Sequence, residues 1–70
     1  MGAYRVLSIE KNQFNKTADC QCYADTKADA NSGNAPEGLP EGYTIAPGSI
    51  VRTGSWEVGT MKSDGTWGWA

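Results

Sequence analysis

Short stretches of alternating apolar and polar residues, separated by turn-forming residues, run along this whole chain. The pattern is clearest in the C-terminal third, where a proline–glycine pair precedes alternation over residues 50–53 and 56–61. A Ser63-Asp64-Gly65 turn follows, and residues 66–69 return as a short strand. Asp-Gly between such stretches is a strong hairpin signal, because both residues tolerate the positive φ of tight turns. The sequence therefore predicts a three-stranded antiparallel meander over residues 46–70.

The N-terminal segment predicts a β-hairpin that begins with a strand over residues 3–10. In this strand Tyr4 and Val6 share one face, and Leu7 and Ile9 share the other. Apolar residues on both faces predict that both are at least partly covered, as in a sandwich or a sheet shared between subunits.

The second strand of this hairpin is predicted over residues 18–25, antiparallel to the first, with Cys20 and Cys22 on the same face. The polar, asparagine-rich loop between the strands spans residues 11–17. Its single large apolar side chain, Phe14, is expected to fold back as a plug.

Residues 24–30, ADTKADA, are compatible with either a short helix or a turn. Either Asp25 or Thr26 is placed to cap it. The segment is too short and too polar to form a helix on its own, so any helix here depends on contacts with the sheet.

Residues 31–45 form the longest stretch without a strand pattern, and they contain two Pro-Glu-Gly steps. Proline and glycine at this spacing give successive turns and exclude a regular helix or strand. We expect either an exposed loop or an arm that wraps a neighbouring chain. The apolar residues of this stretch are Leu39, Tyr43 and Ile45, and Tyr43 belongs either to the arm or to the core.

These elements predict an all-β fold with a small antiparallel sheet, in one domain overall. Residues 1–30 form the N-terminal β-hairpin with a short helix or turn, residues 31–45 the Pro/Gly-rich loop or arm, and residues 46–70 the meander. A chain of 70 residues with nine glycines buries little surface relative to its conformational entropy. Chains of this size commonly gain stability from partners, so a homo-oligomer is expected.

Charge and hydropathy bear on the partners. The net charge is −2 and no basic patch is present, which argues against nucleic acid as a partner. No apolar stretch is long enough to span a membrane, and no signal-peptide pattern follows Met1. We therefore expect no membrane association and synthesis in a cytoplasm.

Candidate chemistry is sparse. The chain has no histidine, so no Ser-His, Cys-His or His-metal arrangement is available. Cys20 and Cys22 lie too far apart on a strand for a relaxed disulfide and lack further zinc ligands, so we expect two reduced, buried side chains. The carboxylate pairs Asp25/Asp29 and Glu37/Glu41 lie in polar segments with nothing to tune their pKa values. No catalytic residue, no metal site and no cofactor is predicted, and an enzyme is not expected.

The three tryptophans are the most distinctive residues. Trp56 is expected in the core, cross-strand from Trp67 or Trp69. Trp67 and Trp69 lie two positions apart and share one face of the last strand. They are expected either to close the core, to anchor a protein interface, or to form a stacking platform for sugar rings.

The order Ala46-Pro47-Gly48-Ser49, an apolar strand, a turn, a second strand and then Ser63-Asp64-Gly65-Thr66-Trp67 resembles a C-terminal module of short virion proteins of tailed bacteriophages. The opening AYRVLSIEKNQF and the later YADTKADA are also similar to those proteins. The resemblance implies a non-enzymatic structural part of a phage particle, such as a head fibre, a capsid decoration protein or a neck or tail accessory. It implies location in the virion, with self-association and other virion proteins as partners.

The residues expected to mediate this assembly are Leu39, Tyr43, Ile45, Trp67 and Trp69. On this hypothesis, truncation of either C-terminal tryptophan weakens assembly and leaves the fold largely intact. Two other functions stay open: a carbohydrate-binding module with a glycan partner held by Trp67 and Trp69, and a small inhibitor of a host protein.

Overall fold

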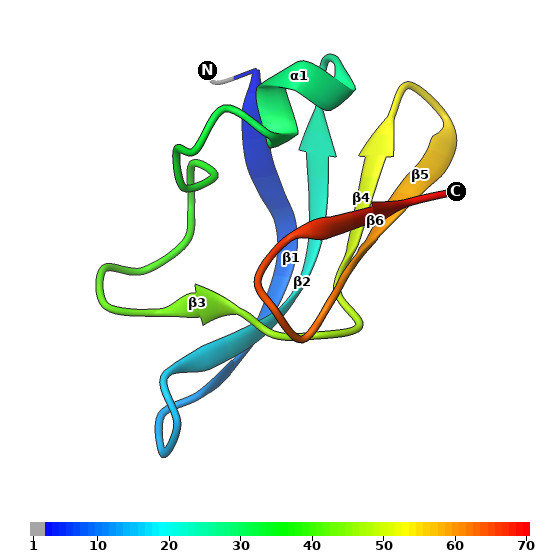
Figure 1. Cartoon of the computed structure of the whole chain (residues 1–70). Coiled ribbons are helices and arrows are strands. Elements are labelled where there is room, and N and C mark those ends of the chain that lie inside the picture. Colours follow the sequence, from blue (N-terminus) through cyan, green and yellow to red (C-terminus); the bar gives the residue numbers. More distant parts are fainter. Residues whose placement is uncertain (1–2) are drawn as a thin grey trace.

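A computed structural model describes residues 3–70, so the first two residues of the predicted N-terminal unit lie outside the described part. The described residues form one six-stranded sheet and one short helix (Figure 1). The elements in chain order are β1 (Tyr4–Asn12), β2 (Thr17–Ala24), α1 (Lys27–Ala30), β3 (Thr44–Ile45), β4 (Ile50–Thr53), β5 (Trp56–Met61) and β6 (Trp67–Trp69). The main strand order is β1-β2-β4-β5-β6, and β3 also pairs with β2. The all-β prediction is confirmed.

The predicted N-terminal hairpin is present, since β1 and β2 pair antiparallel. The register shifts between Val6 and Ser8, which leaves Leu7 as the extra residue of a β-bulge. Beyond the bulge Ile9 lies opposite Cys20 and therefore on the same face as Tyr4. The prediction that Leu7 and Ile9 share the face opposite Tyr4 is thus wrong for Ile9. Leu7 is 50% exposed, so residues 3–70 do not provide the expected cover over this side chain.

Phe14 lies in the loop that joins β1 to β2 and is 97% exposed. The expectation that it folds back as a plug is wrong. The loop forms the end of a hairpin that extends beyond the other strands, so no part of the chain's own core is available to cover the ring (Figure 1).

The helical alternative is correct for the segment after β2, and Thr26 rather than Asp25 caps it. The Thr26 hydroxyl oxygen accepts a hydrogen bond from Asp29 N at 3.2 Å and donates one to Asp29 Oδ2 at 3.0 Å. The bond from Asp29 N satisfies one of the free N–H groups at the start of the helix, as an N-cap residue does. Ala30 at the end of α1 is buried against the sheet.

The 31–45 segment is a loop that folds back on its own sheet. Val6 N donates to Glu37 O at 2.8 Å and Glu37 N donates to Tyr4 O at 2.9 Å, which ties the loop to the outer edge of β1. Further along, β3 pairs in parallel with the start of β2. Two successive turns lie in this part of the loop, closed by hydrogen bonds from Leu39 N to Pro36 O and from Tyr43 N to Pro40 O. Each contains a glycine with positive φ, Gly38 at 99° and Gly42 at 87°.

The C-terminal meander is confirmed, because β4 pairs antiparallel with β5 and β5 with β6. The loop before β6 contains Asp64, whose Oδ1 accepts hydrogen bonds from the Thr66 backbone at 3.0 Å and hydroxyl at 2.6 Å. Gly65 follows in the left-handed region with φ of 86°. The predicted Asp-Gly turn therefore combines a side-chain-stabilised turn with the positive φ that glycine accepts.

Hairpin and meander are joined by the parallel pairing of β2 with β4. The link depends on Ser49, which is 2% exposed and whose Oγ accepts a hydrogen bond from Cys20 N at 3.0 Å. A Pro47-Gly48 turn, with Ser49 N donating to Ala46 O at 3.2 Å and Gly48 at φ 92°, brings the serine to this position. The Ala-Pro-Gly-Ser motif thus supplies a hydrogen-bond acceptor for Cys20 N from the segment between β3 and β4, which is not itself a strand.

Replacement of Ser49 by alanine should lower the free energy of unfolding by about 1–3 kcal/mol, because the buried Cys20 N–H loses its acceptor. Urea unfolding of Ser49→Ala measures this effect, with Ser63→Ala in an exposed turn as the control. A change within roughly 0.5 kcal/mol for Ser49→Ala would show that the hydroxyl is not needed to join the two parts of the sheet.

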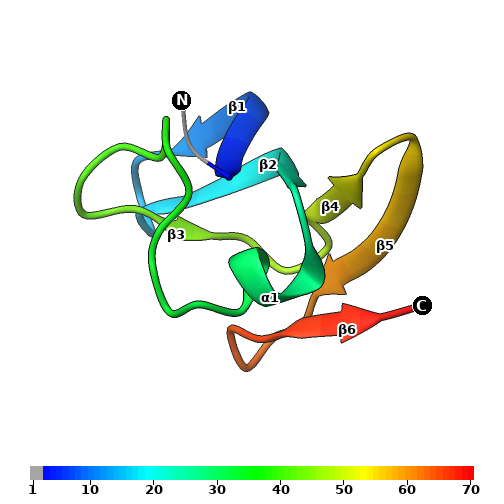
Figure 2. The same ribbon diagram turned by 90° about the horizontal axis from the view of Figure 1, so that it is seen from above.

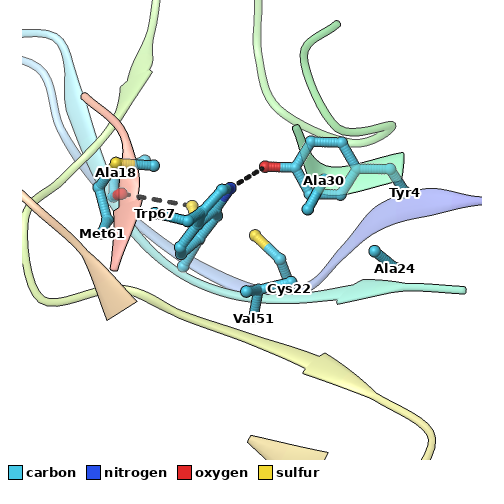
Figure 3. Packing of buried hydrophobic residues seen from close by; sticks show 9 residues of the cluster. Tyr4, Ala18, Cys22, Ala24, Ala30, Val51, Met61 and Trp67 are labelled. Carbon is cyan, nitrogen blue, oxygen red and sulfur yellow. Dashed lines mark hydrogen bonds between the residues drawn. The ribbon is translucent and has the colours of Figure 1, made fainter. Parts of the chain in front are cut away.

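The sheet curls so that its first and last strands approach each other around the core, with α1 on the concave side (Figure 2). Trp67 Nε1 on β6 donates a hydrogen bond to the Tyr4 hydroxyl on β1 at 3.2 Å (Figure 3). Cys22 and Val51 are fully buried near this pair. The Tyr4–Trp67 bond therefore connects side chains from the two ends of the curled sheet.

Candidate functional site

A cleft of about 500 Å³ lies between the 31–45 loop, the end of α1 and the strands that carry Tyr4 and Trp67. Four of the five predicted interface residues line it: Leu39, Tyr43, Ile45 and Trp67. The loop brings the first three there because its attachments to β1 and β2 hold it along the concave side. The structure thus brings together four of the predicted residues, which come from segments far apart in the chain.

The predicted residues do not project freely as handles of an arm. Leu39, Tyr43 and Ile45 are half-buried against the core of the same chain. Lys16 Nζ lies 5.3 Å from the centre of the Tyr43 ring, a cation–π distance that holds this ring at the rim. These side chains form the wall of a preformed cleft.

Trp67 lies at the base of this cleft and is only 6% exposed, so it is a core residue. Its ring centre is 6.5 Å from that of Trp69, with the two planes tilted by 33°. Trp69 is half-buried and lies outside the cleft lining, with Lys27 Nζ 5.5 Å from its ring centre. Because Trp67 is covered, the two rings do not form the exposed sugar-stacking platform that the sequence left open.

Trp56 is 75% exposed, and the expectation that it belongs to the core is wrong. It lies beside the turn at the start of β5, where its cross-strand neighbour is Thr53. β6 pairs only with Gly59 to Met61, so it does not extend far enough to cover Trp56. The expected pairing of Trp56 with Trp67 or Trp69 is therefore absent.

Gly59 provides the space for the Trp69 ring. The two residues lie directly opposite each other on β5 and β6. A Cβ atom at position 59 would lie 2.8 Å from two ring carbons of Trp69 and 3.0 Å from Val51 Cγ1. Neither the Trp69 ring nor the Val51 methyl group is the mobile end of a long side chain that could move away, so the close contact requires glycine at this position.

We expect Gly59→Ala to destabilise the fold by about 1–3 kcal/mol, as overpacking of a tight core does. Gly68→Ala on β6 is the matched control, since its Cβ would meet mainly the flexible Lys62 side chain at 3.3 Å. Thermal unfolding followed by circular dichroism compares the two variants. Equal melting temperatures for both would contradict the role assigned to Gly59.

Sequence reasoning missed most of the other residues that line the cleft, and the two largest of these are Tyr4 and Met61. Tyr4 was assigned only to a strand face, and nothing local indicates that its hydroxyl meets an indole from the other end of the chain. Burial raises the pKa of Tyr4 to about 12, and the hydrogen bond from Trp67 opposes this shift. The tyrosine therefore stays neutral at physiological pH.

The two cysteines are free and buried, which confirms the expectation of reduced core side chains. Burial raises the pKa of both thiols, and for Cys22 it reaches about 12. Protonated, covered thiols are poor nucleophiles. Among residues 3–70 no group of three or more His, Cys, Asp or Glu side chains is placed to hold a metal ion.

The cleft can bind an apolar or aromatic group by contact. Its lining contains no charged side chain, and its polar members include Asn31, Asn34, Thr44 and Thr66. Mostly apolar walls with a few hydrogen-bonding groups are typical of binding pockets, and the volume falls in their usual range. The lining holds no carboxylate from either considered acid pair.

No protein-family model, no curated protein and no solved structure is significantly similar to this chain. Within the described residues, no helix has the length and apolar character needed to cross a membrane. The resemblance to phage virion proteins therefore stays a prediction.

Proposed function

We propose that this chain is a non-enzymatic structural protein of a tailed-bacteriophage particle, acting by self-association and by docking on other virion proteins. Head fibre, capsid decoration and neck or tail accessory are the roles that the motif resemblance implies. The observation that carries the proposal is the exposure of four large apolar side chains on so small a chain. These residues are Leu7, Ile9, Phe14 and Trp56.

The edge strand β1 adds a second argument for association. One side of β1 pairs with β2, and on its other side the described residues provide only the bridge between Arg5 and Glu37. Residues 8–12 of β1 thus present an edge with no neighbouring strand in the described chain. Open edges and exposed apolar residues are features that another chain can cover.

A protein that assembles on a particle can attach through contacts that are individually weak. Identical copies arranged by symmetry repeat the same contact, so that a modest surface gives strong attachment through avidity. A chain with few large core side chains and several exposed ones is suited to such a role.

Light scattering of the purified chain over a concentration series under reducing conditions tests self-association. We expect the mass to rise above that of the 7.5 kDa chain towards a discrete oligomer or a growing assembly. Mass spectrometry of particles from the native source tests docking, and the chain should occur there in fixed ratio to the other virion proteins. A monomer at every concentration, or absence from the particles, would overturn the proposal.

A further inference from the structure

Phe14 and the cleft are two apolar features on different parts of the same chain. Phe14 is 97% exposed at the end of the β1–β2 hairpin, which projects from the body of the molecule (Figure 1). The cleft lies at the concave side and is lined by Tyr4, Met61 and Trp67 together with the 31–45 loop. A projecting ring and an apolar hollow can form a contact between two copies.

The loop that carries Phe14 is held in shape by its own side chains. Phe14 N donates to Asn12 Oδ1 at 3.0 Å. Asn15 Oδ1 accepts from the Thr17 backbone at 3.2 Å and from the Thr17 hydroxyl at 2.7 Å. Two such side-chain turns on either side of Phe14 constrain the backbone of the loop, which lowers the ordering cost of binding.

The electrostatics of the two features are complementary. Lys11 lies three residues before Phe14, whereas the Lys16 ammonium lies against Tyr43 of its own chain. The 31–45 loop that walls the cleft contains Glu41 and no basic residue. Opposite charges on the two surfaces favour a productive encounter and a defined orientation.

The cleft also fits the expected occupant in size and chemistry. Its volume of about 500 Å³ is sufficient for one aromatic side chain with part of its loop. The polar rim residues Asn31 and Asn34 are available to the amides of Gln13 and Asn15. An aromatic ring seated in an apolar hollow with a polar rim is a common arrangement for an interface anchor.

We infer that Phe14 of one copy inserts into the cleft of a second copy of this chain. The inference rests on the self-association in the proposed function and names the surfaces that perform it. The exposed Phe14, called the knob below, and the cleft are different patches of the surface, so the contact is head-to-tail. Each copy has one of each, and repetition of the contact gives a closed ring or an open filament.

Two variants disable the two sides of this contact separately. Phe14→Ala removes the knob at a fully exposed position, and Ala35→Trp fills the cleft from an exposed position in its lining. Asn34→Arg is a second way to block the cleft if Ala35→Trp does not fold. Gln13→Ala, in the same loop as Phe14, is the matched control. Circular dichroism confirms the fold of each variant before the assembly is measured.

Light scattering and analytical ultracentrifugation then give a distinct result for a head-to-tail contact. Phe14→Ala alone and Ala35→Trp alone should be monomeric, and Gln13→Ala should assemble like the unmodified chain. An equimolar mixture of the two disabled variants should form a dimer and nothing larger, because that pair retains one intact knob and one intact cleft.

The outcomes separate this inference from the proposed function. If the unmodified chain assembles and Phe14→Ala assembles equally well, the inference is overturned while self-association stands. If the mixture of disabled variants stays monomeric, the complementary pairing of knob and cleft is overturned. If the unmodified chain is monomeric at all concentrations, the proposed self-association fails, and with it the contact inferred here.

Discussion

Trp67→Ala is expected to remove a large part of the stability of this chain. Truncation of a buried tryptophan costs about 3–5 kcal/mol, and here it also removes the hydrogen bond from Trp67 Nε1 to the buried Tyr4 hydroxyl. This loss is a large fraction of the roughly 4–10 kcal/mol that stabilises a domain of this size. Urea unfolding followed by circular dichroism should therefore give an unfolding free energy lower by at least about 3 kcal/mol.

Trp56→Ala is the control for this prediction, because the Trp56 ring is 75% exposed. Its unfolding free energy should stay within roughly 0.5 kcal/mol of the unmodified chain. The contrast reverses the roles expected from the sequence, in which Trp56 stabilised the fold and Trp67 was available for assembly. A folded Trp67→Ala variant together with an unfolded Trp56→Ala variant would contradict the structure.

Alkaline solution is expected to lower the free energy of unfolding of the protein between about pH 9 and pH 12. Burial raises the pKa of Cys22 from 9.0 to about 12 and that of Tyr4 from 10.0 to about 12. Between these values the unfolded chain releases protons that the folded chain still holds, so the free energy of unfolding falls as pH rises. Below about pH 9 both groups stay protonated in both states, and their contribution is fully present.

The size of this effect follows from the shift at Cys22, which corresponds to a loss of about 4 kcal/mol by pH 12. Urea unfolding at several pH values from 7 to 11, with a reductant present, measures the slope. In Cys22→Ala the slope should be shallower, because one of the shifted groups is gone. An unfolding free energy that is constant from pH 8 to pH 11 would rule out the buried thiol as a determinant of alkaline stability.

Local turn chemistry made much of the fold predictable. The Asp64-Gly65 turn and the Pro47-Gly48 turn occur where the sequence placed them, and β5 spans the predicted residues 56–61. Each of these depends on φ preferences and alternation within a few residues. By contrast, the parallel pairing of β2 with β4 joins segments separated by the whole 31–45 loop, and no local pattern encodes it.

Burial of individual tryptophans was not predictable from the same patterns. Whether Trp56 is covered depends on how far β6 extends along β5, and the pattern of residues in β5 does not give that length. The bulge at Leu7 likewise changes the face of every later residue in β1, and alternation alone does not reveal it.

Some residues of the cleft could be predicted from the sequence, but their common location could not. Leu39, Tyr43 and Ile45 could be identified because they are the large apolar residues of a polar loop. Their common location with Trp67, Tyr4 and Met61 results from the curled sheet and from the attachment of Glu37 to β1. Those contacts form only in the folded chain.

The hydrogen bond between Tyr4 and Trp67 also has a consequence for biosynthesis, since it joins residues 63 positions apart. A ribosome adds roughly 5–20 residues per second, so the β1–β2 hairpin leaves the exit tunnel seconds before Trp67. During that interval the hairpin carries an uncovered apolar face and an open edge, and long-range closure is the slow step of such folds. We expect the chain to fold only after Trp67 has emerged, and the nascent hairpin to be the stage at which it most needs a chaperone.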